Sequence, residues 1–329
     1  MNSIKKFLKG ISGSTWAGIV LILFFAIVID NYLGSRNVMN ILKSTSALIV
    51  VSVGMTMAIL LGEIDMSVGG IITISATAAG MYMQSVETVT AGTVVAAVII
   101  CCLTGFAFGV FNGYMIGIKR FNFWLVTFGS MSISFGLAKG ITKGGVLSGF
   151  DKKFQWISTG SFMGISMCII WAFLISILAL LFLYKTRFGL HIYAIGDSEV
   201  CAANSGIDVR KTRFLVYALS GLMAGLASVL LLARTNSAGA TVGEGYEFNA
   251  IAAVVIGGTA MEGGKGGFKG TIFGAVFISA MKNGLQLIGL SNYWQQVLLG
   301  VVIMAIILYD VINAKIRLKK SLRRVYSEG

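Results

Sequence analysis

The residues best able to do chemistry in this sequence are two carboxylates that interrupt a long apolar stretch. Glu63 and Asp65 lie in the segment GEIDMSVGG (62–70), which also carries Ser67 and joins two apolar runs. At membrane depth a charge costs several kcal/mol unless it is paired or hydrated, so such a break must face protein or water. Two interpretations follow. Either Asp65 or Ser67 caps the next helix, or Glu63, Asp65 and Ser67 line or gate a polar passage.

Two asparagines raise the same question. Asn112 and Asn283 lie within or at the edge of apolar runs, and in a membrane each amide must find a hydrogen-bond partner. Each side chain can either join helices or contact a polar substrate, and the sequence leaves both roles open. We therefore include Asn112 and Asn283 among the candidate residues of the passage.

A glycine-rich segment, GGTAMEGGKG (257–266), resembles a phosphate-binding loop without matching one. Thr259 stands where the template requires the first glycine, and Gly266 follows Lys265 in place of Ser or Thr. The segment is better interpreted as a tight reversal between two spans. The lone His191 has no paired nucleophile, and the four cysteines show no CxxC or Cys–His spacing. We predict no enzyme activity, catalytic residue, metal site or cofactor in this chain.

The composition indicates what elements must position these residues. Apolar residues (AVILMFWYC) make up 56% of the chain, only 12% is charged, and the mean hydropathy is +0.86. Globular proteins carry roughly 25% charged residues, so we predict an all-α polytopic membrane protein. The net charge is +13, but the basic residues flank apolar runs and form no stripe with interleaved aromatics. This pattern argues against nucleic acid as a partner.

The apolar runs give the number of spans, because a bilayer core needs about 20 apolar residues per helix. Ten candidates follow: 16–33, 44–61, 67–83, 91–118, 123–138, 165–184, 214–232, 249–261, 270–288 and 293–314. We predict one transmembrane domain over residues 1–329. Its approximate halves are 1–160 and 161–314, and a basic tail, 315–329, follows them.

The distribution of basic residues sets the orientation of the chain. The first run follows Lys5, Lys6 and Lys9 and has no A-x-A-like cleavage site, so we interpret it as an uncleaved anchor. Alternating spans from a cytoplasmic N-terminus place 18 of the 26 Lys and Arg residues inside. By the positive-inside rule both termini are cytoplasmic. The tail is expected to contact anionic lipid headgroups.

Two features indicate how the spans pack. The segments 47–70 and 218–243 both run from an apolar helix into a Ser- and Gly-bearing break. They belong to the second and seventh spans, which cross in opposite senses, so they predict two inverted five-helix halves. Gly105, Gly109, Gly113 and Gly117 recur every four residues. This spacing favours close helix packing inside the bundle over packing at a subunit interface.

The longest cytoplasmic loop, 185–213, carries a second candidate site. Asp197 or Ser198 can start and Gly206 can end a short Ala-rich helix near 198–205. A small, smooth helix presented by a membrane domain suits a groove on a partner protein, and a surface helix without a partner is the alternative. The candidate contact residues are Asp197, Ser198, Glu199, Ala202, Ala203, Asn204 and Gly206.

Several blocks together resemble the permease subunits of ribose-type monosaccharide ABC importers. They are VGMT (53–56), GEIDMSVG (62–69), RFG (187–189), YAIG (193–196), AANSGI (202–207), GYEFNAIAAVVIGGT (245–259), GGKG (263–266) and NGL (283–285). They occur in the expected order over about 45–310. One departure is the absence of proline: the family commonly has a proline before the second span, where this chain reads LGSRN (33–37).

The resemblance implies a function that composition cannot show. It implies a permease that passes a sugar by alternating access through a dimer interface in the prokaryotic cytoplasmic (inner) membrane. It also implies three partners: a separate ATPase that uses the ATP, an extracytoplasmic sugar-binding protein and a second permease subunit. In that family the helix near 198–205 is the coupling helix to the ATPase. The alternatives are a branched-chain amino-acid ABC permease and an ion-coupled secondary transporter that uses Glu63 or Asp65.

Overall fold

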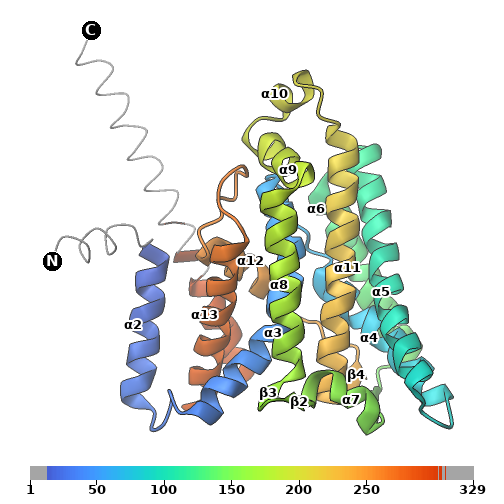
Figure 1. The fold of residues 1–329 in the computed structure, drawn as a ribbon, viewed down its shortest axis with the longest axis vertical. Coiled ribbons are helices and arrows are strands. Elements are labelled where there is room, and N and C mark those ends of the chain that lie inside the picture. The colour runs from blue at the N-terminus through green and yellow to red at the C-terminus, as the bar shows by residue number, and fades with distance from the viewer. Residues whose placement is uncertain (1–12, 303, 306–307, 309–329) are drawn as a thin grey trace. The chain divides into compact units, whose positions relative to one another are not determined.

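The computed structural model describes residues 13–302, 304–305 and 308, and within them the chain is mostly helical (Figure 1). The chain forms two compact units, which are described separately: residues 34–279, and residues 1–33 together with 280–329. The N-terminal lysines and the basic tail 315–329 lie outside the described residues.

The larger unit holds most of the elements. In chain order they are α3 (Ser35–Leu60), α4 (Val68–Ser85), α5 (Ala91–Gly113), η1 (Tyr114–Ile118), α6 (Phe123–Thr142), β1 (Val146–Ser148), α7 (Lys152–Thr159), β2 (Ser161–Phe162), β3 (Ile165–Ser166), α8 (Met167–Lys185), α9 (Arg187–Asp197), α10 (Glu199–Asn204), α11 (Val209–Thr235), β4 (Ser237–Gly239), α12 (Tyr246–Ile256) and the first part of α13 (Phe268–Leu287). The smaller unit holds α2 (Gly13–Val28), the end of α13 and a helix over 292–302.

The helices agree with the predicted spans in position and differ in length. α3 begins at Ser35, well before the predicted 44, and α11 begins at Val209 because the Asp208 side chain accepts a hydrogen bond from the Lys211 amide at 3.0 Å. α12 ends at Ile256, earlier than the predicted 261, where Gly258 adopts a left-handed φ of 85°. The last predicted span lies partly outside the described residues.

Four helical stretches in the described residues are long and apolar enough to cross a membrane: α3, α5 with η1, α8 and α11. In their most apolar windows 78% of α3 and 72% of α11 is buried, against 22% for α5 with η1 and 28% for α8. α3 and α11 therefore form the centre of the larger unit, while α5 and α8 present apolar side chains outward. This is the arrangement of a multi-pass membrane protein, in which outward apolar faces meet lipid.

A glycine seam holds α5 against α11. A Cβ atom on Gly109 would lie 2.6 Å from the Tyr217 carbonyl oxygen and 3.0 Å from the Gly221 Cα. A Cβ on Gly105 would lie 2.8 Å from the Gly225 Cα, and one on Gly117 would lie 2.7 Å from the Arg210 carbonyl oxygen. The four-residue spacing therefore serves packing within the unit, as predicted, because only glycine lets these backbones approach so closely.

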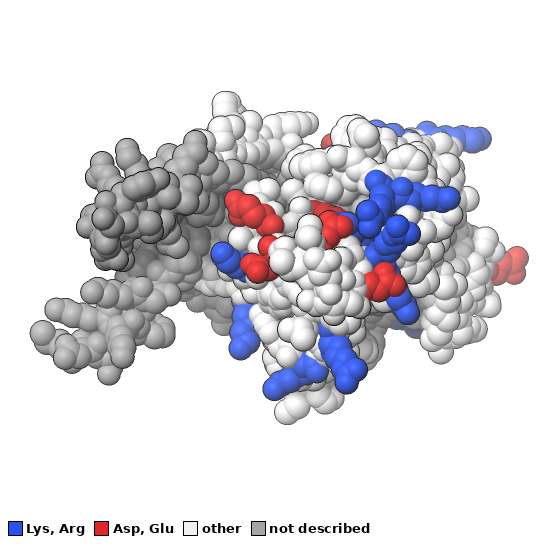
Figure 2. Space-filling view, turned by 90° about the horizontal axis from the view of Figure 1, so that it is seen from above, with Lys and Arg blue, Asp and Glu red and all other residues white. Residues whose placement is uncertain are grey.

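Three of the basic segments predicted to be cytoplasmic gather at one end of the larger unit. Arg120 lies near enough to Glu199 of α10 for its positive charge to lower the pKa of that carboxyl. The Tyr193 hydroxyl of α9 donates to the Gly266 carbonyl at 2.9 Å. The segment 185–213 holds two helices, α9 and α10, and the start of α11 at Val209, so the prediction of a loop with one short helix is corrected. Figure 2 looks onto this end and shows Lys and Arg side chains toward its margin, with acidic side chains between them.

Short strands close the opposite end of the larger unit. β1 pairs with β4 in antiparallel register, with Val146 opposite Gly239, and β2 pairs with β3. Asn236, which ends α11 with a φ of 52°, accepts a hydrogen bond from the Phe150 amide at 2.8 Å. These contacts tie the segment after α6 to the end of α11.

In the smaller unit a buried hydroxyl joins distant parts of the chain. The Tyr32 hydroxyl donates to the Ala280 carbonyl of α13 at 2.7 Å. Gly284 packs against the Phe25 ring: a Cβ added to Gly284 would lie 2.6 Å from the nearest ring atoms. A buried polar contact and a glycine contact therefore connect the start of the chain to α13.

We expect Gly109→Ala to lower the stability of the folded protein by about 1–3 kcal/mol, because the added Cβ meets backbone atoms that cannot rotate away. Thermal unfolding in detergent measures the change. Gly136→Ala on α6 is the matched control, since no atom lies within 4 Å of its Cβ position and alanine is the better helix former. Equal midpoints for Gly109→Ala and the control would show that the seam is not close-packed.

Candidate functional site

The polar break between α3 and α4 is built on a glycine. Gly62 ends α3 with a left-handed φ of 78°, a conformation that L side chains rarely adopt. The Leu60 carbonyl at this helix end accepts a hydrogen bond from the Gly264 amide at 2.9 Å. A Cβ on Gly62 would lie 3.0 Å from the Glu262 carbonyl oxygen. The glycine-rich reversal 257–266 therefore packs directly against the break.

Glu63 forms an ion pair with Arg213 of α11. Arg213 Nε lies 2.6 Å from Glu63 Oε1, and its Nη1 and Nη2 donate to Glu199 Oε1 and Oε2 of α10 at 3.0 and 2.8 Å. The side chains of Glu63 and Arg213 are 7% and 18% exposed, and that of Glu199 is 42% exposed. One guanidinium thus joins the break to α10, and its contact with Glu199 is planar and bidentate.

Asp65 is fully buried and held by hydroxyl and amide donors. Its Oδ1 accepts hydrogen bonds from the Ser67 hydroxyl and, at 3.0 Å, from the Ser67 amide. Its Oδ2 accepts one from the Ser220 hydroxyl of α11 at 2.7 Å. Asn112 of α5 donates to the Ser67 hydroxyl at 2.9 Å. The structure therefore brings Asp65, Ser67 and Asn112 together, and Ser67 stands at the start of α4 without a side-chain cap bond.

A second break, before α12, meets the start of α4. The Gly243 amide donates to the Thr73 hydroxyl at 3.0 Å, and a Cβ on Gly69 would meet the Glu247 carboxylate. Glu247 and Asn249 are only 3% and 6% exposed. Neither Glu247 nor Asn249 was predicted as a site residue, although the similarity of 47–70 to 218–243 indicated that two breaks exist.

These two buried side chains each have an oxygen that can bind a solute. Oε1 of Glu247 accepts a hydrogen bond from the Gly245 amide at 3.2 Å. Its Oε2 and the Oδ1 of Asn249 accept none from the described part of the chain. Buried polar atoms are normally hydrogen-bonded, so these two oxygens are candidates to contact water or a polar substrate.

The short helix predicted near 198–205 is present as α10, and its role as a coupling helix stays a prediction. Ser198 is its N-cap and accepts a hydrogen bond from the Cys201 amide at 3.3 Å, and Gly206 follows it with a φ of 83°. Ala202 is buried in the apolar cluster that also contains Ile192 and Ile195 of α9. Asp197, Ala203, Asn204 and Gly206 are exposed. Among the candidate residues, Ala202 therefore packs inward, and the exposed residues form the outward face of this segment.

Two apolar residues on the outward face of α9 and α10 were not predicted as contact residues. Val200 of α10 and Leu190 of α9 are 69% and 67% exposed. α9, which also contains His191, was missed as a helix. Its start is set by Thr186, whose hydroxyl accepts a hydrogen bond from the Gly189 amide at 3.3 Å. Exposed apolar residues at this end of the larger unit are available to a protein partner.

Asn283 is the one candidate path residue that belongs to the smaller unit. It lies on α13 and is partly buried. Its role in the passage stays a prediction. No three His, Cys, Asp or Glu side chains group as metal ligands in the described ranges.

The charge state of Glu199 depends on its arginine. The hydrogen bonds from Arg213 hold the pKa of Glu199 below its usual range, against a smaller opposing effect of burial. A carboxyl whose pKa is lowered in the folded state adds stability above its unfolded pKa and loses it as the pH falls through the folded value. The Glu199–Arg213 pair therefore persists at neutral pH and weakens in acid.

We expect Arg213→Gln to cost about 3 kcal/mol or more of stability, because it leaves Glu63 buried without its cation. Thermal unfolding at neutral pH measures the loss. The double variant Glu63→Gln/Arg213→Gln should recover part of it by removing the buried charge. Arg210→Gln, an exposed change three residues away on the same helix, serves as the control. An Arg213→Gln midpoint equal to that of the control would contradict the pairing.

Comparison with known proteins places the chain in a family. The model described as "Branched-chain amino acid transport system / permease component" matches residues 37–307. The ribose import permease protein of Bacillus subtilis (strain 168) is 36% identical over 294 residues, covering 88% of this chain and 89% of that protein. The ribose import permease protein of Escherichia coli (strain K12) is 36% identical over 296 residues, covering 89% and 91%.

A further relative is the D-allose transport system permease protein of Escherichia coli (strain K12), 30% identical over 297 residues, covering 90% of each chain. No solved structure matches the chain. The resemblance to permeases of the ribose-type importers is thereby confirmed. The chain therefore belongs to the family described as "Branched-chain amino acid transport system / permease component". Within that family it is similar to ribose import permeases.

Proposed function

We propose that this chain is the membrane-spanning permease subunit of an ATP-driven importer of monosaccharides. The similarity to permeases named for ribose and D-allose supports the substrate class. The observation that carries the mechanism is Arg213, which joins an exposed cytoplasmic helix to a polar break inside the bundle. Such a connection suits a subunit that converts a partner's movement into opening and closing of a passage.

The proposal includes the finer architecture. We take the chain to have ten spans in two inverted five-helix halves, about 1–160 and 161–314, with both termini in the cytoplasm. The meeting of two similar breaks, Gly69 with Glu247 and Thr73 with Gly243, supports paired halves. The grouping of basic segments around α9 and α10 supports a cytoplasmic location for that end. The membrane is then the prokaryotic cytoplasmic (inner) membrane.

The partners follow from the family in general. A separate cytoplasmic ATPase would bind α10 and hydrolyse the ATP, so this chain needs no cofactor of its own. An extracytoplasmic sugar-binding protein would deliver the substrate, and a second permease subunit would complete the passage. The outward apolar Leu190 and Val200 fit the first of these contacts.

The path of coupling runs through named contacts. A displacement of α10 moves Glu199, and the bidentate pair carries Arg213 with it. Arg213 in turn holds Glu63, two residues before Asp65. Asp65 binds α11 through Ser220 and reaches α5 through Ser67. The start of α4 therefore changes position with the cytoplasmic helix.

Two alternatives fit less well. The family description names branched-chain amino acids, but the relatives above are named for sugars. An ion-coupled transporter needs a carboxylate available to its ion. That alternative relied on Glu63 or Asp65, but Glu63 is paired with Arg213, and Asp65 accepts hydrogen bonds from Ser67 and Ser220. The relatives above are named as import and transport-system permeases.

Reconstitution with the cognate ATPase and binding protein in proteoliposomes tests the function. We expect uptake of radiolabelled ribose or allose that requires both partners and ATP on the ATPase side, and that a protonophore does not reduce. An excess of leucine should not compete. Uptake driven by a proton or sodium gradient without the ATPase would overturn the proposal, and uptake of leucine in place of sugar would reassign the substrate.

Val200→Asp tests the coupling surface. A carboxylate on the exposed face of α10 should reduce ATPase co-purification and sugar uptake at least tenfold, because an apolar contact would bury an unpaired charge. Val146→Asp is the matched control, since Val146 is 68% exposed at the opposite end, in β1. Its ATPase co-purification should equal that of the wild type. If Val200→Asp retains as much ATPase as the control variant, α10 is not part of the ATPase contact.

A further inference from the structure

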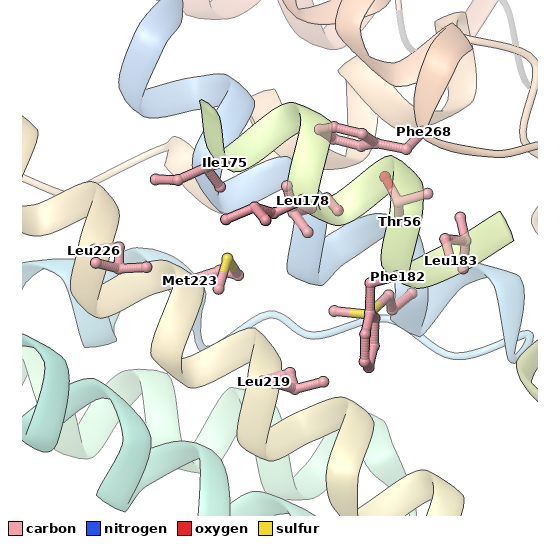
Figure 3. A pocket seen from close by; sticks show the side chains of 12 residues that line it. Thr56, Ile175, Leu178, Phe182, Leu183, Leu219, Met223, Leu226 and Phe268 are labelled. Atoms are coloured by element: carbon pink, nitrogen blue, oxygen red, sulfur yellow. The ribbon is translucent and has the colours of Figure 1, made fainter. Parts of the chain in front are cut away.

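The larger unit contains one pocket that the proposed passage does not use. It has a volume of about 330 Å³ and lies between α3, α8 and α11, with Phe268 of α13 at one side (Figure 3). Leu219, Met223 and Leu226 line it from α11, and Leu178 and Phe182 line it from α8. Leu178 is 65% exposed and Phe182 is 37% exposed, so the pocket opens on the outward, apolar side of α8.

The chemistry of the lining excludes a sugar. Thr56 is the only polar residue among those that line the pocket. Its hydroxyl lies 2.6 Å from the Ser52 carbonyl, to which it donates, and 2.9 Å from the Thr271 hydroxyl. A monosaccharide would lose its hydrogen bonds to water here without replacement. The pocket instead suits a flexible hydrocarbon chain.

Two cations follow lining residues of this pocket in the sequence, one at the end of α8 and one at the start of α13. Lys269 directly follows the lining residue Phe268, and its ammonium lies 5.8 Å from the centre of the Tyr184 ring. Lys185 directly follows Tyr184, which itself follows the lining residue Leu183. Both lysines are exposed. An apolar slot that ends beside two cations matches an acyl chain that ends in a phosphate.

We propose that this pocket holds an acyl chain of an anionic phospholipid of the cytoplasmic leaflet, with its phosphate between Lys185 and Lys269. The hydrocarbon fills the space between α8 and α11 just below α9. The headgroup then lies where α8 passes into the helices that the proposed ATPase contacts. The site depends on the proposed orientation of the chain in the membrane and not on the identity of the transported sugar.

Native mass spectrometry of the purified full chain tests the site, with dioleoyl phosphatidylglycerol and dioleoyl phosphatidylcholine as probes. We expect one phosphatidylglycerol retained per protomer, in preference to phosphatidylcholine of the same chains. Lys185→Gln/Lys269→Gln should weaken phosphatidylglycerol retention roughly tenfold or more and leave phosphatidylcholine retention unchanged. The exposed control pair Lys139→Gln/Lys152→Gln should retain it as the wild type does.

A second variant tests the hydrocarbon part. Ala179→Phe fills the pocket from α8 and should abolish retention of both lipids, with thermal unfolding used to confirm that it folds. Equal retention by the filled variant and the wild type would overturn the proposal, as would an equal effect of both lysine pairs. Retention of a polypeptide at this site in place of lipid would overturn it as well. Loss of sugar uptake with normal lipid retention would count against the proposed function alone.

Discussion

A single guanidinium shared by two glutamates is the interaction that joins α10, α11 and the break after α3. Arg213 lies on α11, one of the two central helices, and reaches α10 on one side and the break after α3 on the other. The pairing permits Glu63 to be buried, since an isolated buried carboxylate is strongly unfavourable. Glu63 in the break is therefore held by a charge on a different helix.

The absence of proline explains why glycine has two roles here. Gly62 and Gly258 end α3 and α12 through left-handed backbone, which glycine adopts without strain. Gly109 and Gly221 instead allow α5 and α11 to touch. Breaks and contacts thus use the same residue type, but in different conformations.

The sequence predicted features whose signal is local. Apolar run lengths placed the helices, four-residue glycine spacing predicted the seam, and Ser198 with Gly206 delimited α10. Contacts between residues distant in the chain leave no such local pattern in the sequence. Arg213 was counted only as a cytoplasmic cation, because nothing near it in sequence indicates Glu63. Glu247 was missed because it sits at the start of an apolar run and its neighbour, Gly69, comes from the other break.

The glycine seam also fixes an order of assembly. Gly109 and Gly221 are more than one hundred residues apart, so the face of α5 that contacts α11 is complete long before its partner is synthesised. At about 5–20 residues per second, that interval is roughly 5–20 s. During biogenesis this exposed glycine face must remain against lipid or the insertion machinery, and the centre of the unit closes only when α11 arrives.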